Sequence, residues 1–196
     1  MDFIRPGILD HSVVFAFIIF LMSVLDELLS KIARKSYLRG FQRYFVYMGL
    51  NGNIRSSNLY LRWSLKISIP ALLILISYLA EITADDTAAA LYQAFAGFAF
   101  FDYLIIDLRH LENILIYRLS GTDNSSRRSP DLEGELIIGR RFALMKSAFQ
   151  VFVIALLLFG VLIFHPTYFI FGGMVAPMLI SIRNLILSNT LKSNLF

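Results

Sequence analysis

Five long apolar segments constrain this chain more than any other feature of its sequence. They run over residues 12–29, 63–80, 87–107, 146–164 and 168–187. About 20 residues of α-helix, rising 1.5 Å each, cross a hydrocarbon core ~30 Å thick, so each segment is long enough to span a bilayer. Membranes admit only helices or closed barrels, and the sequence lacks the alternation that is typical of barrel strands. The sequence therefore predicts an all-α integral membrane bundle of about five transmembrane helices.

The composition agrees with a membrane class. Hydrophobic residues make up 57% of the 196 residues and charged residues 16%, whereas soluble domains carry about a quarter charged residues. The absence of cysteine excludes disulfides, iron–sulfur clusters, thiolate zinc sites and cysteine nucleophiles. Residues 1–14 lack the basic start and small-residue cleavage site of a secretory signal, so the first apolar segment is expected to be a retained helix. We expect one multi-pass membrane domain over residues 1–196.

The distribution of basic residues predicts the orientation of the bundle. All of the 18 lysines and arginines except Arg5 fall on one side of the five-helix arrangement. The opposite connections hold Glu81, Asp85 and Asp86. Connections rich in lysine and arginine stay on the cytoplasmic side of a cell membrane. We therefore expect the N-terminus outside the cell and the C-terminus in the cytoplasm.

Two connections lie on the basic side. Residues 31–62 first continue the helical pattern of the first segment and then mix aromatic with basic residues. This mixture suits the lipid headgroup boundary, so Arg39 and Arg43 are expected to contact anionic headgroups, although the same surface suits a soluble partner. Residues 121–135 are rich in Ser, Asp, Gly and charge, which is typical of a flexible cytoplasmic loop.

The end of the third segment carries a group of polar residues. Asp107 falls about 30 Å along a helix that begins at Thr87, at the inner boundary of the bilayer. The group comprises Asp107, Arg109, His110 and Asn113. Residues three or four positions apart are neighbours on a helix, so Asp107 with His110 and Arg109 with Asn113 are expected to pair on a solvated helix end.

Asp102 lies deeper, about 22 Å along the same helix, where an acid must face protein or water. Basic or amide side chains from other segments reach a similar inner layer. The intramembrane polar candidates are Asp102, Arg183, Gln150, Lys146, Lys66 and Gln93. Asp102 either clamps helices together, with Arg183 as its partner, or takes part in function. Two pairs of small residues, Ala90 with Ala94 on the third helix and Gly172 with Ala176 on the fifth, predict that helices can approach closely at these positions.

No catalytic motif, nucleotide-binding motif or histidine metal motif occurs in the sequence, so no catalytic residue, metal, cofactor or nucleic-acid partner is predicted. His11 and His165, with nearby carboxylates, are the weak candidates for a zinc or proton site. The favoured hypothesis is a non-enzymatic membrane component that self-associates as a homo-oligomer or anchors a protein partner. The first alternative is a small oligomeric transporter or channel with Asp102 in its path. The second is an intramembrane lipid-modifying enzyme that uses the group at Asp107.

Overall fold

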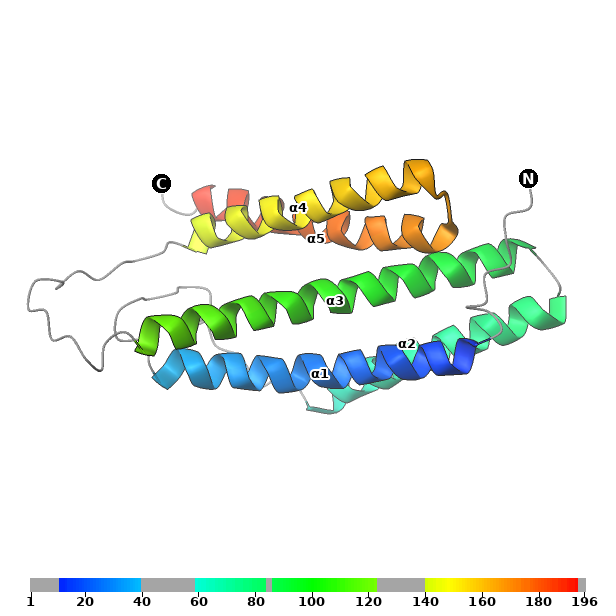
Figure 1. Ribbon diagram of the computed structural model, residues 1–196, viewed down its shortest axis with the longest axis horizontal. Helices are drawn as coiled ribbons and strands as arrows, with labels where there is room; N and C mark the ends of the chain where they lie inside the picture. The colour runs from blue at the N-terminus through cyan, green and yellow to red at the C-terminus, as the bar shows by residue number, and fades with distance from the viewer. Residues whose placement is uncertain (1–10, 40–58, 84–85, 123–139, 194–196) are drawn as a thin grey trace, which may run out of the picture.

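The computed structural model describes residues 11–39, 59–83, 86–122 and 140–193, and within these ranges the chain forms five α-helices (Figure 1). They are α1 (Ser12–Arg39), α2 (Leu59–Thr83), α3 (Asp86–Thr122), α4 (Arg140–Phe164) and α5 (Tyr168–Ser193). Each contains a stretch long and apolar enough to cross a membrane. The prediction of an all-α chain with five such helices is confirmed for this part of the molecule.

The helix ends follow local chemistry. Pro166 cannot continue a helix, and α4 ends at Phe164, two residues before it. Thr167 then caps α5, because its Oγ1 accepts a hydrogen bond from the backbone N–H of Ile170 at 3.2 Å. The resulting short turn makes α4 and α5 an antiparallel hairpin. α5 contains Pro177 and remains helical through it.

Helix α3 lies at the centre of the arrangement. Helices α1 and α2 pack against one side of it and against each other, whereas α5 packs against the other side and carries α4 (Figure 1). The start of α1, the end of α2, the start of α3 and the α4–α5 turn share one end of the molecule. The helix ends therefore have the arrangement that the five-helix pattern predicts.

Glycines set the distance between α3 and α5. A Cβ atom on Gly97 would lie 1.8 Å from the carbonyl oxygen of Phe169, and one on Gly172 would lie 1.8 Å from that of Ala94. Both distances are far below van der Waals contact, so the backbones meet at these positions. The expected close approach of helices at Ala94 and Gly172 is confirmed.

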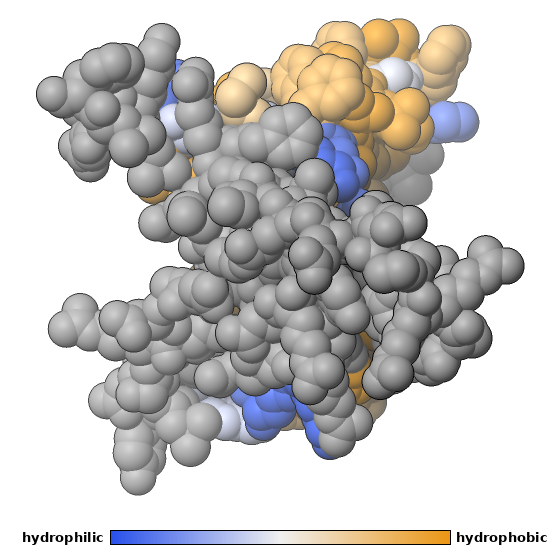
Figure 2. Space-filling model, turned by 90° about the vertical axis from the view of Figure 1, so that its left-hand side faces the viewer, coloured by the Kyte–Doolittle hydropathy of each residue, from blue (hydrophilic) through white to orange (hydrophobic). Residues whose placement is uncertain are grey.

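The core between α1, α2 and α3 is apolar and tightly packed. Ile19, Leu73 and Tyr92, one from each helix, have no exposed surface. Rings of Phe15, Phe100 and Phe169 extend this core toward α5, with centroid separations of 5.9–6.2 Å. Side chains on the outer faces are also largely apolar. Figure 2 shows such side chains gathered on the side where Figure 1 places α4 and α5.

The two predicted cytoplasmic connections are described only at their edges. In the connection 31–62, residues 31–39 belong to α1 and residues 59–62 to α2. In the connection 121–135, residues 121–122 end α3. Arg43 and the predicted flexible segment 123–135 lie outside the described residues, and Arg39 is described only as the last residue of α1.

Candidate functional site

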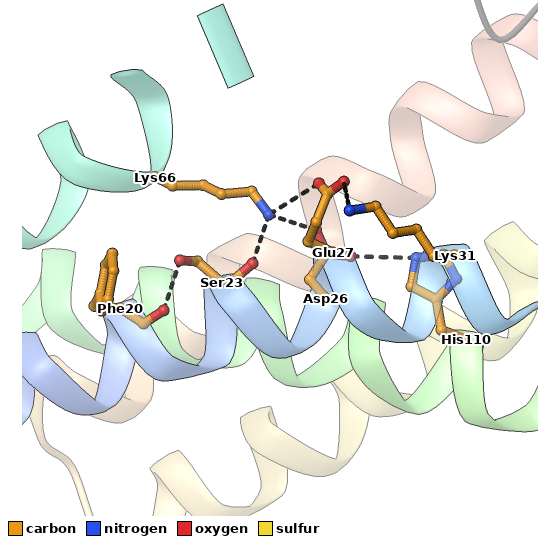
Figure 3. Close-up of polar contacts among 7 residues, drawn as sticks. All are labelled: Phe20, Ser23, Asp26, Glu27, Lys31, Lys66 and His110. Carbon is orange, nitrogen blue, oxygen red and sulfur yellow. Dashed lines mark hydrogen bonds and ion pairs between the residues drawn. The ribbon is translucent and has the colours of Figure 1, made fainter. Parts of the chain in front are cut away.

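A group of ionisable side chains lies between α1, α2 and α3 (Figure 3). We call it the charged cluster. It comprises Asp26, Glu27 and Lys31 from α1, Lys66 from α2, and Asp107 and His110 from α3. The cluster lies about 21 Å along α1, counted from Ser12 to Asp26 at 1.5 Å per residue.

Lys66 occupies the centre of the cluster. Its Nζ donates a hydrogen bond of 2.6 Å to the backbone carbonyl of Ser23 and lies 3.3 Å from Glu27 Oε2 and 3.9 Å from Asp26 Oδ2. Only 9% of the Lys66 side chain is exposed. The Trp63 ring lies 5.9 Å from the same ammonium group, within the range of a cation–π contact. Lys66 thus joins α2 to α1 through a buried positive charge.

Glu27 and Asp26 each contact a second partner. The other carboxylate oxygen of Glu27 lies 3.5 Å from Lys31 Nζ, one helical turn further along α1, and the Lys31 side chain is exposed. Asp26 Oδ1 lies 3.2 Å from His110 Nε2 on α3. Asp26 therefore joins α1 to α3.

Asp107 is the buried carboxylate of α3 within the cluster. It is 5% exposed, and it lies within electrostatic reach of Asp26, Lys66 and His110. Its Oδ1 atom has no hydrogen-bond partner in the part of the chain that the structure describes. The expectation of a solvated helix end is therefore wrong for Asp107, because α1 and α2 cover this face of α3. His110 forms its closest ionic contact with Asp26 of α1, and its influence on the expected partner Asp107 is electrostatic.

Two of the other polar candidates, Lys146 and Gln150 on α4, lie at more open positions. Glu112 of α3 accepts a hydrogen bond of 3.4 Å from Gln150 Nε2 and lies 3.8 Å from Lys146 Nζ. All three side chains are exposed or half-exposed. Gln93 is buried. These contacts place Lys146 and Gln150 together on α4, away from Lys66.

Asp102 and Arg183 do not form the proposed clamp in direct contact. Asp102 is half-buried, Arg183 is exposed, and their charges act on each other at a distance. Within the described ranges, no ion pair joins the two side chains. Arg109 and Asn113 are half-buried on α3, and Arg109 has its own interaction partner.

The opposite end of the molecule holds a shallow cavity of about 310 Å³ between the start of α1 and the end of α2. His11, Ser77 and Glu81 are among its lining residues. His165 lies in the α4–α5 turn. Among the residues that the structure describes, no three His, Asp or Glu side chains are grouped as metal ligands.

Sequence reasoning does not identify the two acids that α1 contributes to the charged cluster. Asp26 and Glu27 interrupt an apolar run, which by itself signals an intramembrane polar site. Their place just before Lys31 makes them resemble the start of the basic connection instead. The polar contacts of the hairpin, Asn184 with Ser147 at 3.0 Å and Ser181 with the Ala148 carbonyl at 2.9 Å, were also not predicted.

The charged cluster can pair helices electrostatically, and it can exchange protons because it combines carboxylates with an imidazole. These are the two chemical capacities that its residues supply. No protein-family model matches the sequence, and neither do any curated proteins or solved structures.

Proposed function

We propose that the chain is an integral membrane protein whose five helices all cross a cell membrane. The end of the molecule that is nearest to the charged cluster lies in the cytoplasm, and the N-terminus lies outside. Five helices of sufficient length and apolarity support the insertion. The asymmetric distribution of Lys and Arg supports the orientation. Arg39 and Arg43 then fall at the cytoplasmic surface, where they attract anionic headgroups.

Within that membrane the protein acts as a non-enzymatic component that associates with a second copy of itself through α4. The observation that carries this proposal is the environment of Gly160. Among the described glycines, Gly97, Gly172 and Gly173 each face a backbone or ring at close range, whereas a Cβ on Gly160 would meet nothing within 4 Å. Small residues in membrane helices mark places where another helix approaches closely. Among the described residues, Gly160 lacks such a neighbour.

The geometry of α4 directs Gly160 outward. The buried positions Ala148, Val151 and Ala155 share the face that packs against α5. At about 100° per residue, Gly160 points to the opposite face, together with Phe149 and Phe164. These two rings are 70% and 80% exposed, so this face has no partner in the described chain. Gly160 therefore leaves a notch in an otherwise bulky, exposed apolar face, and the α4 of a second copy can approach closely there.

Mass measurement of the protein in lipid nanodiscs tests this proposal. The wild type is expected to be a dimer or a higher oligomer, and Gly160→Leu is expected to shift it to the monomer because the added side chain fills the notch. Val161→Leu is the matched control, since it adds bulk to a neighbouring face of the same helix. A monomeric wild type, or an oligomer that Gly160→Leu leaves intact, would contradict self-association through α4.

A second candidate is ion-coupled transport by such an oligomer, with Asp102 and the charged cluster on the path. Ionisable side chains inside membrane helices often mark ion or proton pathways, which favours this candidate. The apolar core at Ile19, Leu73 and Tyr92 separates the cluster from the other end of α1–α3, so transport requires these helices to move apart. The flux of ions or protons across the membrane of liposomes that contain the protein distinguishes transport from a purely structural role. The lipid-modifying alternative requires lipid access to Asp107, which is buried here.

A further inference from the structure

We infer that the charged cluster is a binding site for one exchangeable proton, shared among Asp26, Asp107 and His110. The proton strengthens the contact between α1 and α3. This inference concerns the interior of the α1–α3 unit and does not depend on self-association through α4.

Negative groups outnumber positive groups in the charged cluster when His110 is neutral. Glu27 has two cationic partners, Lys31 at 3.5 Å and Lys66 at 3.3 Å. Lys66 lies further from Asp26, at 3.9 Å, and Asp107 has no hydrogen-bonded cation in the described chain. Asp26 and Asp107 therefore share two partners: the ammonium group of Lys66, which also pairs with Glu27, and the imidazole of His110. With the imidazole neutral and both acids ionised, this part of the cluster lacks one positive charge.

The burial of Asp107 makes a negative charge on its carboxylate costly. A carboxylate that is 5% exposed and has an oxygen without a hydrogen-bond partner is costly, because burial removes its hydration. Asp107 and His110 are three residues apart on one face of α3, and His110 Nε2 also faces Asp26. A proton held in this group supplies the missing charge without bringing a new ion into an apolar environment.

The surrounding groups favour a proton over a metal ion. The ammonium group of Lys66 already occupies the space between the two acids of α1. In the ranges that the structure describes, no set of three His, Asp or Glu side chains could hold a metal. The titratable and charged groups within electrostatic reach of Asp107 are Asp26 on α1, Lys66 on α2, and Tyr103 and His110 on α3. His110 also contacts Asp26, on which the half-buried Asp102 of α3 acts in turn.

The packing assigns a side from which the proton enters. His110 and Asp26 are 26% and 22% exposed, and Lys31 is 71% exposed, so the cluster opens toward the end at which α1 finishes. In the other direction, Ile19 and Tyr92 are fully buried and close the core. The proton therefore exchanges with one side, the cytoplasmic side in the proposed orientation.

The full-length protein in detergent micelles provides the test. A folded state that holds one more proton than the unfolded state loses stability as the pH rises, by up to tenfold in the unfolding equilibrium constant per pH unit. Because the histidine of an unfolded chain itself holds a proton below about pH 6.5, wild type should show this loss between about pH 6.5 and pH 8. Asp107→Asn, which keeps the shape of the side chain, should flatten it, as should His110→Gln. His165→Gln, at the turn between α4 and α5, is the matched control and should leave the pH dependence unchanged.

Two further measurements keep the inference open to refutation if the variants fold poorly. Unfolding the wild type at pH 7 in weak buffer with a pH indicator should release about one proton per chain. No release, or a pH dependence that Asp107→Asn leaves intact, overturns the inference. Replacing sodium with choline at constant ionic strength should not change stability, and a loss of stability would identify sodium rather than a proton as the bound cation.

Discussion

Lys66→Met removes the buried ammonium group that α2 places between the two acids of α1, while keeping a flexible apolar side chain of similar length. The carbonyl of Ser23 loses its 2.6 Å hydrogen bond, and Glu27 and Asp26 lose a cation at 3.3 and 3.9 Å. Because both acids lie in a largely buried environment, their desolvation is no longer compensated at this point.

The size of the effect follows from what remains. Breaking a buried ion pair costs about 3–5 kcal/mol of unfolding free energy. Lys31 still pairs with Glu27 and His110 still contacts Asp26, so we expect the lower end of this range, about 3 kcal/mol. The matched control is Lys146→Met, which removes a cation that is 51% exposed and lies 3.8 Å from Glu112. A pair this exposed contributes about 0–1 kcal/mol.

Equilibrium unfolding in mixed detergent micelles, followed by helical circular dichroism, measures both variants against wild type. Adding Glu27→Gln to Lys66→Met should restore part of the lost stability, because one of the two uncompensated acids is then neutral. If Lys66→Met and Lys146→Met have equal effects, or if Glu27→Gln makes Lys66→Met less stable, the cluster does not hold α2 to α1 by charge.

Two further predictions concern the glycines of the helix surfaces and the relation between Asp102 and Arg183. Gly160→Ala should stabilise the monomer by about 0.5–1 kcal/mol, because alanine favours helix and its Cβ meets nothing. Gly97→Ala and Gly172→Ala should instead destabilise it, since each Cβ would overlap a carbonyl oxygen of the facing helix, and unfolding in micelles checks the sign of all three. Asp102→Asn and Arg183→Gln should have additive effects on unfolding, because no ion pair joins these side chains, and a coupling as large as that between Lys66 and Glu27 would contradict this geometry.

The helices could be predicted from the sequence because their signals are local. The apolar runs, the Pro166 turn and the small residues Ala94 and Gly172 lie in short windows, and each has one structural consequence. Lys66 could also be selected as an inner-layer residue from its depth along the chain alone. In all these cases, position along one helix was sufficient.

The charged cluster could not be assembled in this way, because it depends on how helices are rotated against one another. Depth suggested Arg183 as a partner for Asp102, but residues at equal depth can face different directions. Asp107 was expected in solvent because the length of α3 placed it at a boundary. The structure shows that α1 and α2 extend alongside it and bury it. Lateral packing, which periodicity does not specify, decided both outcomes.

The central claim is that the helices cross a membrane with the basic end in the cytoplasm. The chain contains no cysteine, so single cysteines can be placed without background. Asp85→Cys and Ser125→Cys flank α3 on its two sides in sequence. In intact cells, a membrane-impermeant maleimide should label Asp85→Cys, and it should label Ser125→Cys only after permeabilisation. Labelling of both positions in intact cells, or of both only after permeabilisation, would contradict the five-helix membrane topology.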